Sequence, residues 1–142
     1  MRDQSTEIKI SQLFPPTTIT NANTATVSSI IDRAGFDSLT LAIVMGTLTD
    51  ANATSTVLVE DGDNSALSDA AAVDDKYLIG TEAGAAPTFS DDNKVAKIGY
   101  KGPKRYVRVT LTPVANDAGA FPFAGVAILG KPGTAPLSTQ LV

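Results

Sequence analysis

Short stretches in which apolar and polar residues alternate recur along the chain and predict an all-β protein. The clearest is YVRVTL at residues 106–111, where every second residue is Val or Leu. A period of two is typical of a strand with one face on a core and the other on solvent or a partner. About eight strands are expected: residues 7–13, 26–31, 38–48, 54–60, 76–80 and 121–130, and the two halves of residues 94–113.

Residues 94–113, KVAKIGYKGPKRYVRVTLTP, are predicted to form two strands joined by a tight turn, as a hairpin. Gly102 permits unusual φ values, and Pro103 fixes φ and interrupts ladder pairing. Pro113 is expected to stop the second strand, because proline has no N–H to donate to a ladder.

Residues 38–48, SLTLAIVMGTL, form the strongest predicted strand. Their nearly continuous apolar character favours a central strand that is buried on both faces. Gly35 is a candidate for positive φ in the preceding turn. We expect this strand to form a hairpin with residues 54–60.

Few segments depart from the strand pattern. Residues 65–75 are Ala-rich and follow good N-cap residues, so they are the one segment expected to contain a short helix. Pro15 and Pro16 are expected to end the first strand. Residues 131–142 carry Pro and Gly without periodicity and are expected to be a flexible or docked tail.

The absence of long helices between the strands argues against a parallel βαβ architecture. We therefore expect residues 1–142 to form a single domain with an extended N-terminal segment. Its predicted fold is a two-sheet β-sandwich of jelly-roll type.

Composition narrows the function classes. The chain has 142 residues, 43% of them hydrophobic, which suffices for a core, and it has neither Cys nor His. Thiolate chemistry, disulfides and Ser-His-Asp catalysis are thereby excluded. We expect no enzymatic activity, no cofactor and no metal. Carboxylate-based catalysis and a weak cation site at Asp61, Asp63 and Asp69 are the alternatives left open.

Charge is unevenly distributed along this acidic chain, whose net charge is −4. Residues 50–92 contain ten acidic residues and one Lys, whereas residues 94–108 contain six basic residues and no acid. We predict that the basic residues contact carboxylates of a protein partner, either another protein or a second copy. The candidate interface residues are Lys94, Lys97, Lys101, Lys104, Arg105 and Arg108.

Two other partner classes are disfavoured. Tyr100 and Tyr106 could stack on single-stranded nucleic acid beside the basic residues, but the pI of about 4.6 argues against it. No run of about 18 apolar residues exists, so no membrane partner is expected. The polar N-terminus lacks the apolar region of a secretory signal, and we expect synthesis in a cytoplasm.

Four stretches carry a resemblance to a known family: TATVSSIIDRAGFDSLTLAIVMGTLTDANATSTVLVEDGD, LIGTEAG, DDNKVAKIGYKGPKRYVRVTLTP and AGVAILGKPGTAP. Together they span residues 24–136 and resemble the head cement, decoration or stabilisation proteins of tailed bacteriophages. The resemblance implies a non-catalytic β-sandwich that assembles as a homodimer or homotrimer on the outer capsid surface. It also implies the major capsid protein as partner, and a location in the virion after synthesis in the host bacterium.

The alternative is a carbohydrate- or receptor-binding β module of phage tail or fibre type. Such a module would need exposed aromatic side chains, and the aromatic content is only 6%.

Overall fold

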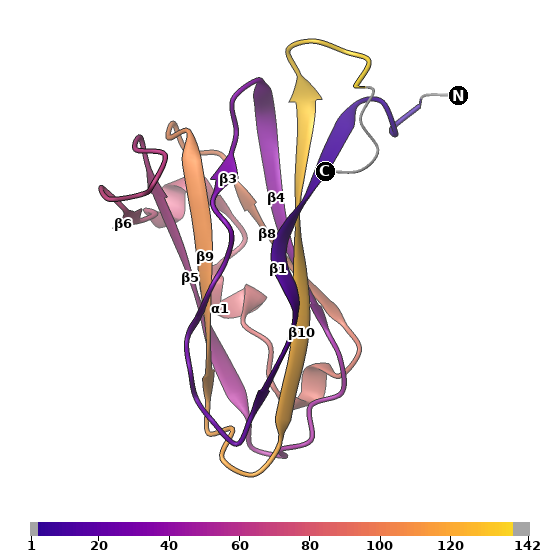
Figure 1. Ribbon diagram of the computed structural model, residues 1–142, viewed down its shortest axis with the longest axis vertical. Helices are drawn as coiled ribbons and strands as arrows, with labels where there is room; N and C mark the ends of the chain where they lie inside the picture. Colours follow the sequence, from indigo (N-terminus) through magenta and orange to yellow (C-terminus); the bar gives the residue numbers. More distant parts are fainter. Residues whose placement is uncertain (1–2, 138–142) are drawn as a thin grey trace.

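The computed structural model describes residues 3–137 as two antiparallel sheets packed face to face (Figure 1). Sheet A has the order β1-β10-β4-β8-β7, and sheet B has the order β2-β9-β5-β6 with β3 also paired to β9. The predicted β-sandwich is therefore confirmed. The strands are β1 Ile8–Thr20, β2 Thr26–Val27, β3 Ile31–Asp32, β4 Phe36–Met45, β5 Thr54–Gly62, β6 Ala71–Ala72, β7 Leu78–Ile79, β8 Val95–Tyr100, β9 Tyr106–Val114 and β10 Ala120–Pro132.

The chain crosses repeatedly between the two sheets, which is the connectivity of a jelly roll. It passes from β1 in sheet A to β2 and β3 in sheet B, and then returns to β4 in sheet A. The two predicted hairpins are wrong for this reason. β4 pairs with β8 and β10, β5 pairs with β9 and β6, and β8 and β9 lie in different sheets. Residues 101–104 therefore form a crossover between sheets instead of a hairpin turn.

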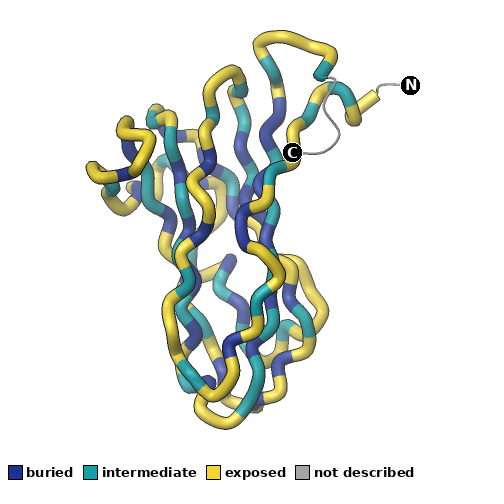
Figure 2. The backbone as a smooth tube through the Cα atoms, in the orientation of Figure 1, coloured by how far each residue is buried: buried dark blue, intermediate teal, exposed yellow. Residues whose placement is uncertain are grey.

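The core lies between the inward-facing sides of the two sheets. On β9, the alternation seen in the sequence is confirmed, because Val107, Val109 and Leu111 are fully buried and their neighbours are half-buried. Figure 2 shows the same alternation of buried and less buried residues along the long strands. Burying one such side chain contributes about 1.5–3 kcal/mol, so this stripe fixes which face of β9 points inward.

Proline interrupts the strands less than the sequence analysis predicted. β1 continues past Pro15 and Pro16, with shifts in its register against β10 between Gln12 and Thr17. β1 is the edge strand of sheet A, where a missing N–H donor and a bulge are tolerated. Pro113 likewise lies inside β9, opposite Ser55.

The one α-helix in residues 3–137, α1 Glu82–Ala85, lies outside the segment where a helix was expected. Residues 65–75 instead form turns and β6, because the Asp69 carboxylate accepts hydrogen bonds from the N–H groups of Asp63 and Asn64. Thr81 caps α1 by accepting from the Gly84 N–H at 3.0 Å. Two short 3₁₀-helices, η1 Asp75–Tyr77 and η2 Phe89–Asp91, complete the elements.

The segment that contains α1 lies along the edge of β5 that faces away from β9, next to the short stretch that pairs with β6. Glu82 Oε1 accepts a hydrogen bond from the Val59 N–H at 2.6 Å, and Phe89 N–H donates to the Ala53 carbonyl at 2.8 Å. These bonds satisfy backbone groups that would otherwise lie at an open sheet edge. In residues 3–137, no helix is both long enough and apolar enough to cross a bilayer.

The predicted C-terminal tail begins inside a strand, since β10 extends to Pro132. Gly133 N–H then donates to the Gly35 carbonyl, and Leu137 N–H donates to the Thr6 carbonyl at 2.8 Å. The remaining tail residues, 138–142, lie outside the described residues. Gly35 has the positive φ that was predicted, +84°.

Candidate protein-interaction surface

The outward side of sheet A carries three rows of side chains that run across the strands. We call this set the apolar face. The strand registers align its members as Ile10, Ile128, Thr40, Gly99 and Ile79; Gln12, Val126, Ala42 and Lys97; and Ala124, Val44 and Val95. Lys97 is the one charged residue of the three rows, and none of them contains an aromatic side chain.

Several aliphatic side chains of the apolar face are open to solvent. Ile79 and Val95 are each 62% exposed, Ile10 is 48% exposed and Val44 is 42% exposed. An antiparallel sheet with one solvated face normally places polar residues there. A contiguous apolar patch on a sheet face is instead typical of an interaction surface.

The outward side of sheet B has a different character. Its two long strands present Thr56, Thr110 and Thr112, together with an ion pair between Arg108 and Glu60. Leu58, which is 39% exposed, lies among these polar residues. Val27 and Val114 are also exposed on sheet B, so the two faces differ mainly in their threonines and ion pair, which the three rows of sheet A lack except for Thr40.

Two grooves lie on the outward side of sheet A. The first, of about 560 Å³, is lined by Lys97, Lys101 and Lys131 beside Ile79 and Gly99, and we call it the lysine groove. The second, of about 340 Å³, lies farther along β4 and β10. It is lined by Pro16, Val44, Gly46, Pro122 and Ala124.

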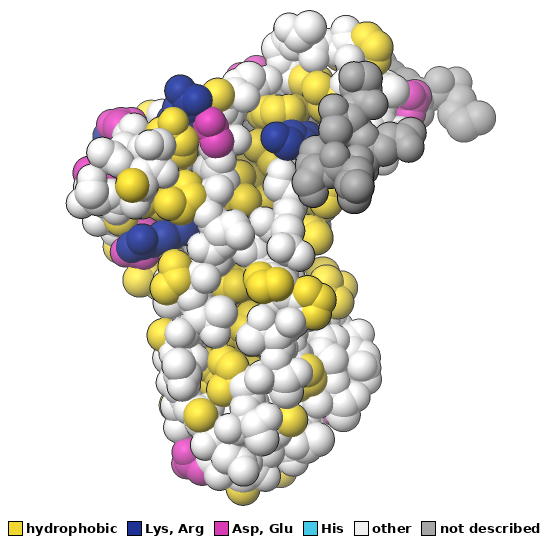
Figure 3. Space-filling model, in the orientation of Figure 1, with side chains coloured by type: hydrophobic (Ala, Val, Ile, Leu, Met, Phe, Trp, Pro, Cys, Tyr) yellow, Lys and Arg dark blue, Asp and Glu magenta, His cyan; other side chains and the backbone are white. Residues whose placement is uncertain are grey.

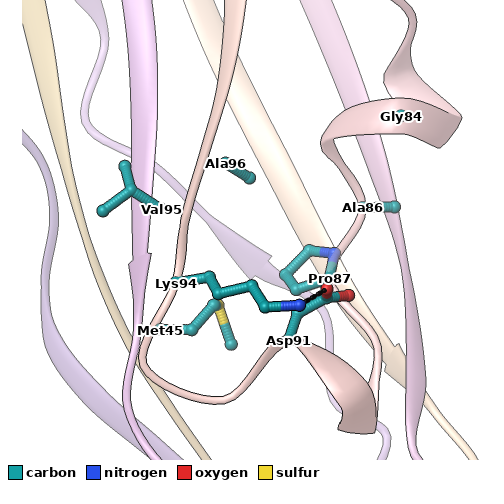
Figure 4. Close-up of a pocket in the computed structure, with 8 residues that line it drawn as sticks. All are labelled: Met45, Gly84, Ala86, Pro87, Asp91, Lys94, Val95 and Ala96. Carbon is teal, nitrogen blue, oxygen red and sulfur yellow. Dashed lines mark hydrogen bonds and ion pairs between the residues drawn. The ribbon is translucent and has the colours of Figure 1, made fainter.

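A smaller pocket, of about 140 Å³, lies beside β8 where the segment after α1 approaches it. Figure 4 shows Ala86 and Pro87 on one side of this pocket and Ala96 on the other. An ion pair between Lys94 Nζ and Asp91 Oδ1, 3.1 Å long, lies at one end of it. The Thr88 N–H and hydroxyl, which donate to the Asp91 carboxylate, and then Lys94 lower the pKa of Asp91.

The six predicted interface residues do not lie on one face. Lys94 precedes β8 of sheet A, Lys97 lies in it and Lys101 follows it. Lys104 and Arg105 precede β9 of sheet B, and Arg108 lies in it. That all six bind a partner stays a prediction.

Four of the six basic residues form ion pairs within the chain. Lys94 pairs with Asp91, Lys104 with Asp63, Arg105 with Asp32 and Arg108 with Glu60. On the face shown in Figure 3, charged side chains gather in the upper half and the lower half is nearly free of charge. Within the described part of the chain, Lys97 and Lys101 have no such ion pair.

The strongest of these pairs by geometry joins Arg105 and Asp32. Arg105 donates from Nε and Nη2 to the two carboxylate oxygens, each at 2.8 Å. This bidentate bond is the main cause that lowers the pKa of Asp32 and raises the pKa of Arg105. Both side chains are about half exposed, so solvent screens the pair and its contribution to stability is small.

A buried polar cluster holds the crossover at residues 101–104. The Tyr100 hydroxyl donates to the Asp61 carboxylate at 2.5 Å and accepts from the Lys104 N–H at 3.1 Å. Arg33 lies over the Tyr100 ring and donates to the carbonyls of Gly102 and Lys104. Burial, and then the bond to Asp61, raise the pKa of Tyr100.

The three carboxylates considered as a weak cation site have other roles. Asp61 accepts from Tyr100, Asp63 pairs with Lys104, and Asp69 accepts from backbone N–H groups. Among residues 3–137, no group of three or more His, Cys, Asp or Glu residues is placed to hold a metal ion.

Sequence reasoning missed the apolar face, although its signal was present. Residues 38–48 and 121–130 are apolar at both alternating positions, and for residues 38–48 this pattern was interpreted as burial on both faces. Val44 shows that the outward positions are partly open in the single chain. A strand that is apolar on both sides can therefore lie in the centre of a sheet, and it can also present an apolar outward surface to a partner.

Comparison with known proteins gives the fold class. No protein-family model and no curated protein matches the chain. The chain is similar to the structure of the PBSX exported protein XepA, with a TM-score of 0.51 and 14% identity. That match covers 99% of this chain and 42% of the other, so the chain spans less than half of that protein's length.

Two further structures are similar at lower scores. The xylan-binding module CBM15 matches with a TM-score of 0.48 and 13% identity, over 94% of this chain and 96% of that one. The enzymatically active domain of tailspike protein 4 of bacteriophage CBA120 matches with a TM-score of 0.45 and 11% identity, over 88% and 20%. Identities this low show the fold alone.

Proposed function

We propose that this chain is a non-catalytic structural protein of a phage virion that binds the outer surface of the head. In this role it stabilises contacts between major capsid subunits, and it also associates with itself as a homodimer or homotrimer. The observation that carries the proposal is the apolar face of sheet A. A broad face whose three rows contain a single charged residue, Lys97, suits contact with another protein surface.

The chemistry of the apolar face favours a protein over a sugar as the ligand. Sugar rings are bound by stacking on flat aromatic side chains, and the three rows contain none. Phe89, 46% exposed, is the only aromatic side chain among the strongly exposed large hydrophobic residues in the described part of the chain. The carbohydrate- or receptor-binding alternative therefore lacks a platform on this face.

The free energy available from burying the apolar face favours binding of many copies to a repeating shell over binding of one copy to a single partner. Burying the exposed parts of Ile10, Val44, Ile79 and Val95 would contribute about 3–6 kcal/mol, at about 1.5–3 kcal/mol per fully buried side chain. Association costs roughly 4–15 kcal/mol in lost rigid-body freedom. One such contact is therefore weak, and many copies on a repeating shell gain affinity through avidity.

The proposal is tested with a double substitution on the apolar face and a matched one on sheet B. The test variant is Val44→Gln with Val95→Gln. The control is Leu58→Gln with Val27→Gln, whose side chains are 39% and 55% exposed. Each protein is mixed with expanded heads assembled from the major capsid protein of the same genome and is then pelleted by ultracentrifugation. Light scattering gives the oligomeric state of each variant.

We expect the wild type and the control variant to pellet with the heads. The test variant should bind at least about tenfold more weakly, which corresponds to about 1.4 kcal/mol. Equal binding by the test and control variants would remove the apolar face from the proposal. A wild-type protein that ignores the heads, but is retained on a glycan matrix, would overturn the structural role and support the binding-module alternative.

A further inference from the structure

β8, Val95–Tyr100, is paired along only a third of its length on one side. β7 pairs with it at Gly99 and Tyr100, and no other strand in residues 3–137 pairs with the rest of β8 on that side. Gly80, with a φ of +95°, follows β7 directly and lies where the chain turns away toward α1. The part of β8 from Val95 to Ile98 therefore has an open edge.

The backbone groups at this edge point away from β4. The Lys94 carbonyl accepts from the Met45 N–H on the β4 side, and the Lys101 N–H donates to the Tyr77 carbonyl on the β7 side. Successive residues of an antiparallel strand alternate in the direction of their N–H and C=O groups. Val95 and Lys97 therefore present their N–H and C=O groups to the open side, where a further strand could pair with them.

The outward side of this edge is basic. The lysine groove begins at Lys97 and continues past Lys101 to Lys131, with Asp37 as the one carboxylate that lines it. None of these three lysines forms an ion pair with a described carboxylate. An added strand would have Lys97, and beyond it Lys101, as cationic neighbours on its outward side, whereas Lys131 lies in β10, two strands away.

The opposite side of the same edge is a narrow, largely aliphatic pocket with the ion pair of Lys94 and Asp91 at one end. The pocket of about 140 Å³ between β8 and the segment after α1 is lined in part by Ala86, Pro87 and Ala96 (Figure 4). An apolar cavity of about 150 Å³ has room for a molecule the size of benzene. One small or branched aliphatic side chain therefore fits it.

We propose that the open edge of β8 binds an extended acidic segment of a partner protein by strand addition. Side chains of a strand alternate between its two sides. The segment therefore places acidic residues toward Lys97 and Lys101, and a small aliphatic residue into the pocket. The inference rests on the proposed function, under which the partner is the major capsid protein.

Charge selects the acidic segment over a second copy of β8. Lysine on an open edge is a common way to prevent pairing between copies of the same strand, because like charges would face one another. The same lysines favour a strand that carries carboxylates. Pairing through Lys97 therefore discriminates between partners as well as adding affinity.

The free protein gives the first test, by amide hydrogen exchange. The amides of Val95 and Lys97 should exchange roughly 100-fold faster than those of Ala96 and Ile98, which point toward β4. Equal protection of all four amides would show that the edge is already covered, and would overturn the proposal.

Two synthetic peptides give the second test. The acidic peptide acetyl-TEVEVET-amide should protect the amides of Val95 and Lys97 from exchange, and added salt should weaken its binding. The basic peptide acetyl-TKVKVKT-amide should not protect them. Equal binding of both peptides, or no protection by the acidic peptide at millimolar concentration, would overturn the proposal.

Variants of Lys97 test the open edge of β8 without removing a hydrogen bond between β8 and β4. Lys97→Pro removes the N–H that points to the open side and leaves the β4 ladder intact, and Lys97→Glu reverses the charge. Each should weaken binding of the acidic peptide at least tenfold. The matched control is Lys9→Glu, which makes the same change in charge at an exposed position of β1 and should leave binding unchanged.

Binding to heads distinguishes this proposal from the proposed function. Head binding that is lost in the apolar-face variant but retained in both Lys97 variants would overturn the role of the edge and leave the proposed function in place. Peptide binding by a protein that ignores heads would overturn the proposed function and support an acidic-peptide site at β8.

Discussion

Replacing Tyr100 by Phe removes one hydroxyl group that joins the two sheets at the β8–β9 crossover. The Tyr100 side chain comes from sheet A and is 2% exposed, and its hydroxyl donates to Asp61 of β5 in sheet B at 2.5 Å. The same oxygen accepts from the Lys104 N–H. The substitution keeps the ring, its packing and its contact with Arg33, so the effect isolates the hydroxyl.

The expected loss follows from the two hydrogen bonds. A bond to a charged acceptor contributes about 1.5–3 kcal/mol, and its loss leaves Asp61 without this donor in a partly buried position. The Lys104 N–H is closer to solvent and regains part of its loss through water. We therefore expect the free energy of unfolding to fall by about 2–3 kcal/mol. For a chain of this size this lowers the melting temperature by roughly 5–10 °C.

Urea unfolding followed by circular dichroism measures this difference. The control is Tyr106→Phe, because Tyr106 is half-buried and its hydroxyl has no hydrogen bond to a described residue. The control should stay within about 0.5 kcal/mol of the wild type. A Tyr100→Phe variant as stable as the control would refute the argument that this hydroxyl holds the sheets together.

The same hydroxyl predicts a dependence on alkaline pH. Because the pKa of Tyr100 is raised in the folded state, its contribution is complete below the usual tyrosine pKa of about 10. Above that pH the unfolded chain loses the proton first, so stability falls by up to about 1.4 kcal/mol per pH unit until the raised pKa is reached. Tyr100→Phe should abolish this part of the alkaline loss, measured by unfolding at pH 8 and at pH 11. An unchanged slope in the variant would contradict it.

Two further predictions concern other buried polar groups. Asn116, fully buried, donates from Nδ2 to the carbonyls of Ile19 and Ala22. Asn116→Ala should therefore cost about 2–3 kcal/mol in chemical unfolding, against less than about 0.5 kcal/mol for the exposed Asn52→Ala. The Ala118 N–H, and then the Asn52 N–H, lower the pKa of Asp50, so its contribution is present above about pH 4 and is lost as pH falls through the lowered value. Asp50→Asn should reduce the loss of thermal stability between pH 6 and pH 3, and an unchanged loss would contradict this assignment.

Local periodicity predicted the strands but could not predict which strands pair. The alternation in residues 106–111 shows which side of β9 is buried, and the structure confirms it. Alternation does not tell whether the next strand continues the same sheet or crosses to the other one. At residues 101–104 the deciding contacts come from Arg33 and Asp61, which are distant in sequence. The predicted hairpins failed for this reason.

The charge pattern shows the same limit. The basic run at residues 94–108 was interpreted as a surface for carboxylates of a partner. In the fold, carboxylates of the same chain reach three of these side chains across 41–73 residues of sequence, as in the pair of Arg105 with Asp32. Such pairs depend on strand register between β3, β5 and β9, which a linear charge pattern does not contain.

The intrachain ion pairs leave fewer basic residues available to bind carboxylates of a partner. Lys104, Arg105 and Arg108 are neutralised by carboxylates on sheet B. Lys97 and Lys101 remain without an ion pair among the described residues, and both border the apolar face of sheet A. Burial of apolar area is non-directional, whereas charges fix orientation and register. A sheet face that carries both aliphatic rows and a few unpaired lysines can therefore gain affinity from apolar burial, summed over many copies, and select its partner by charge.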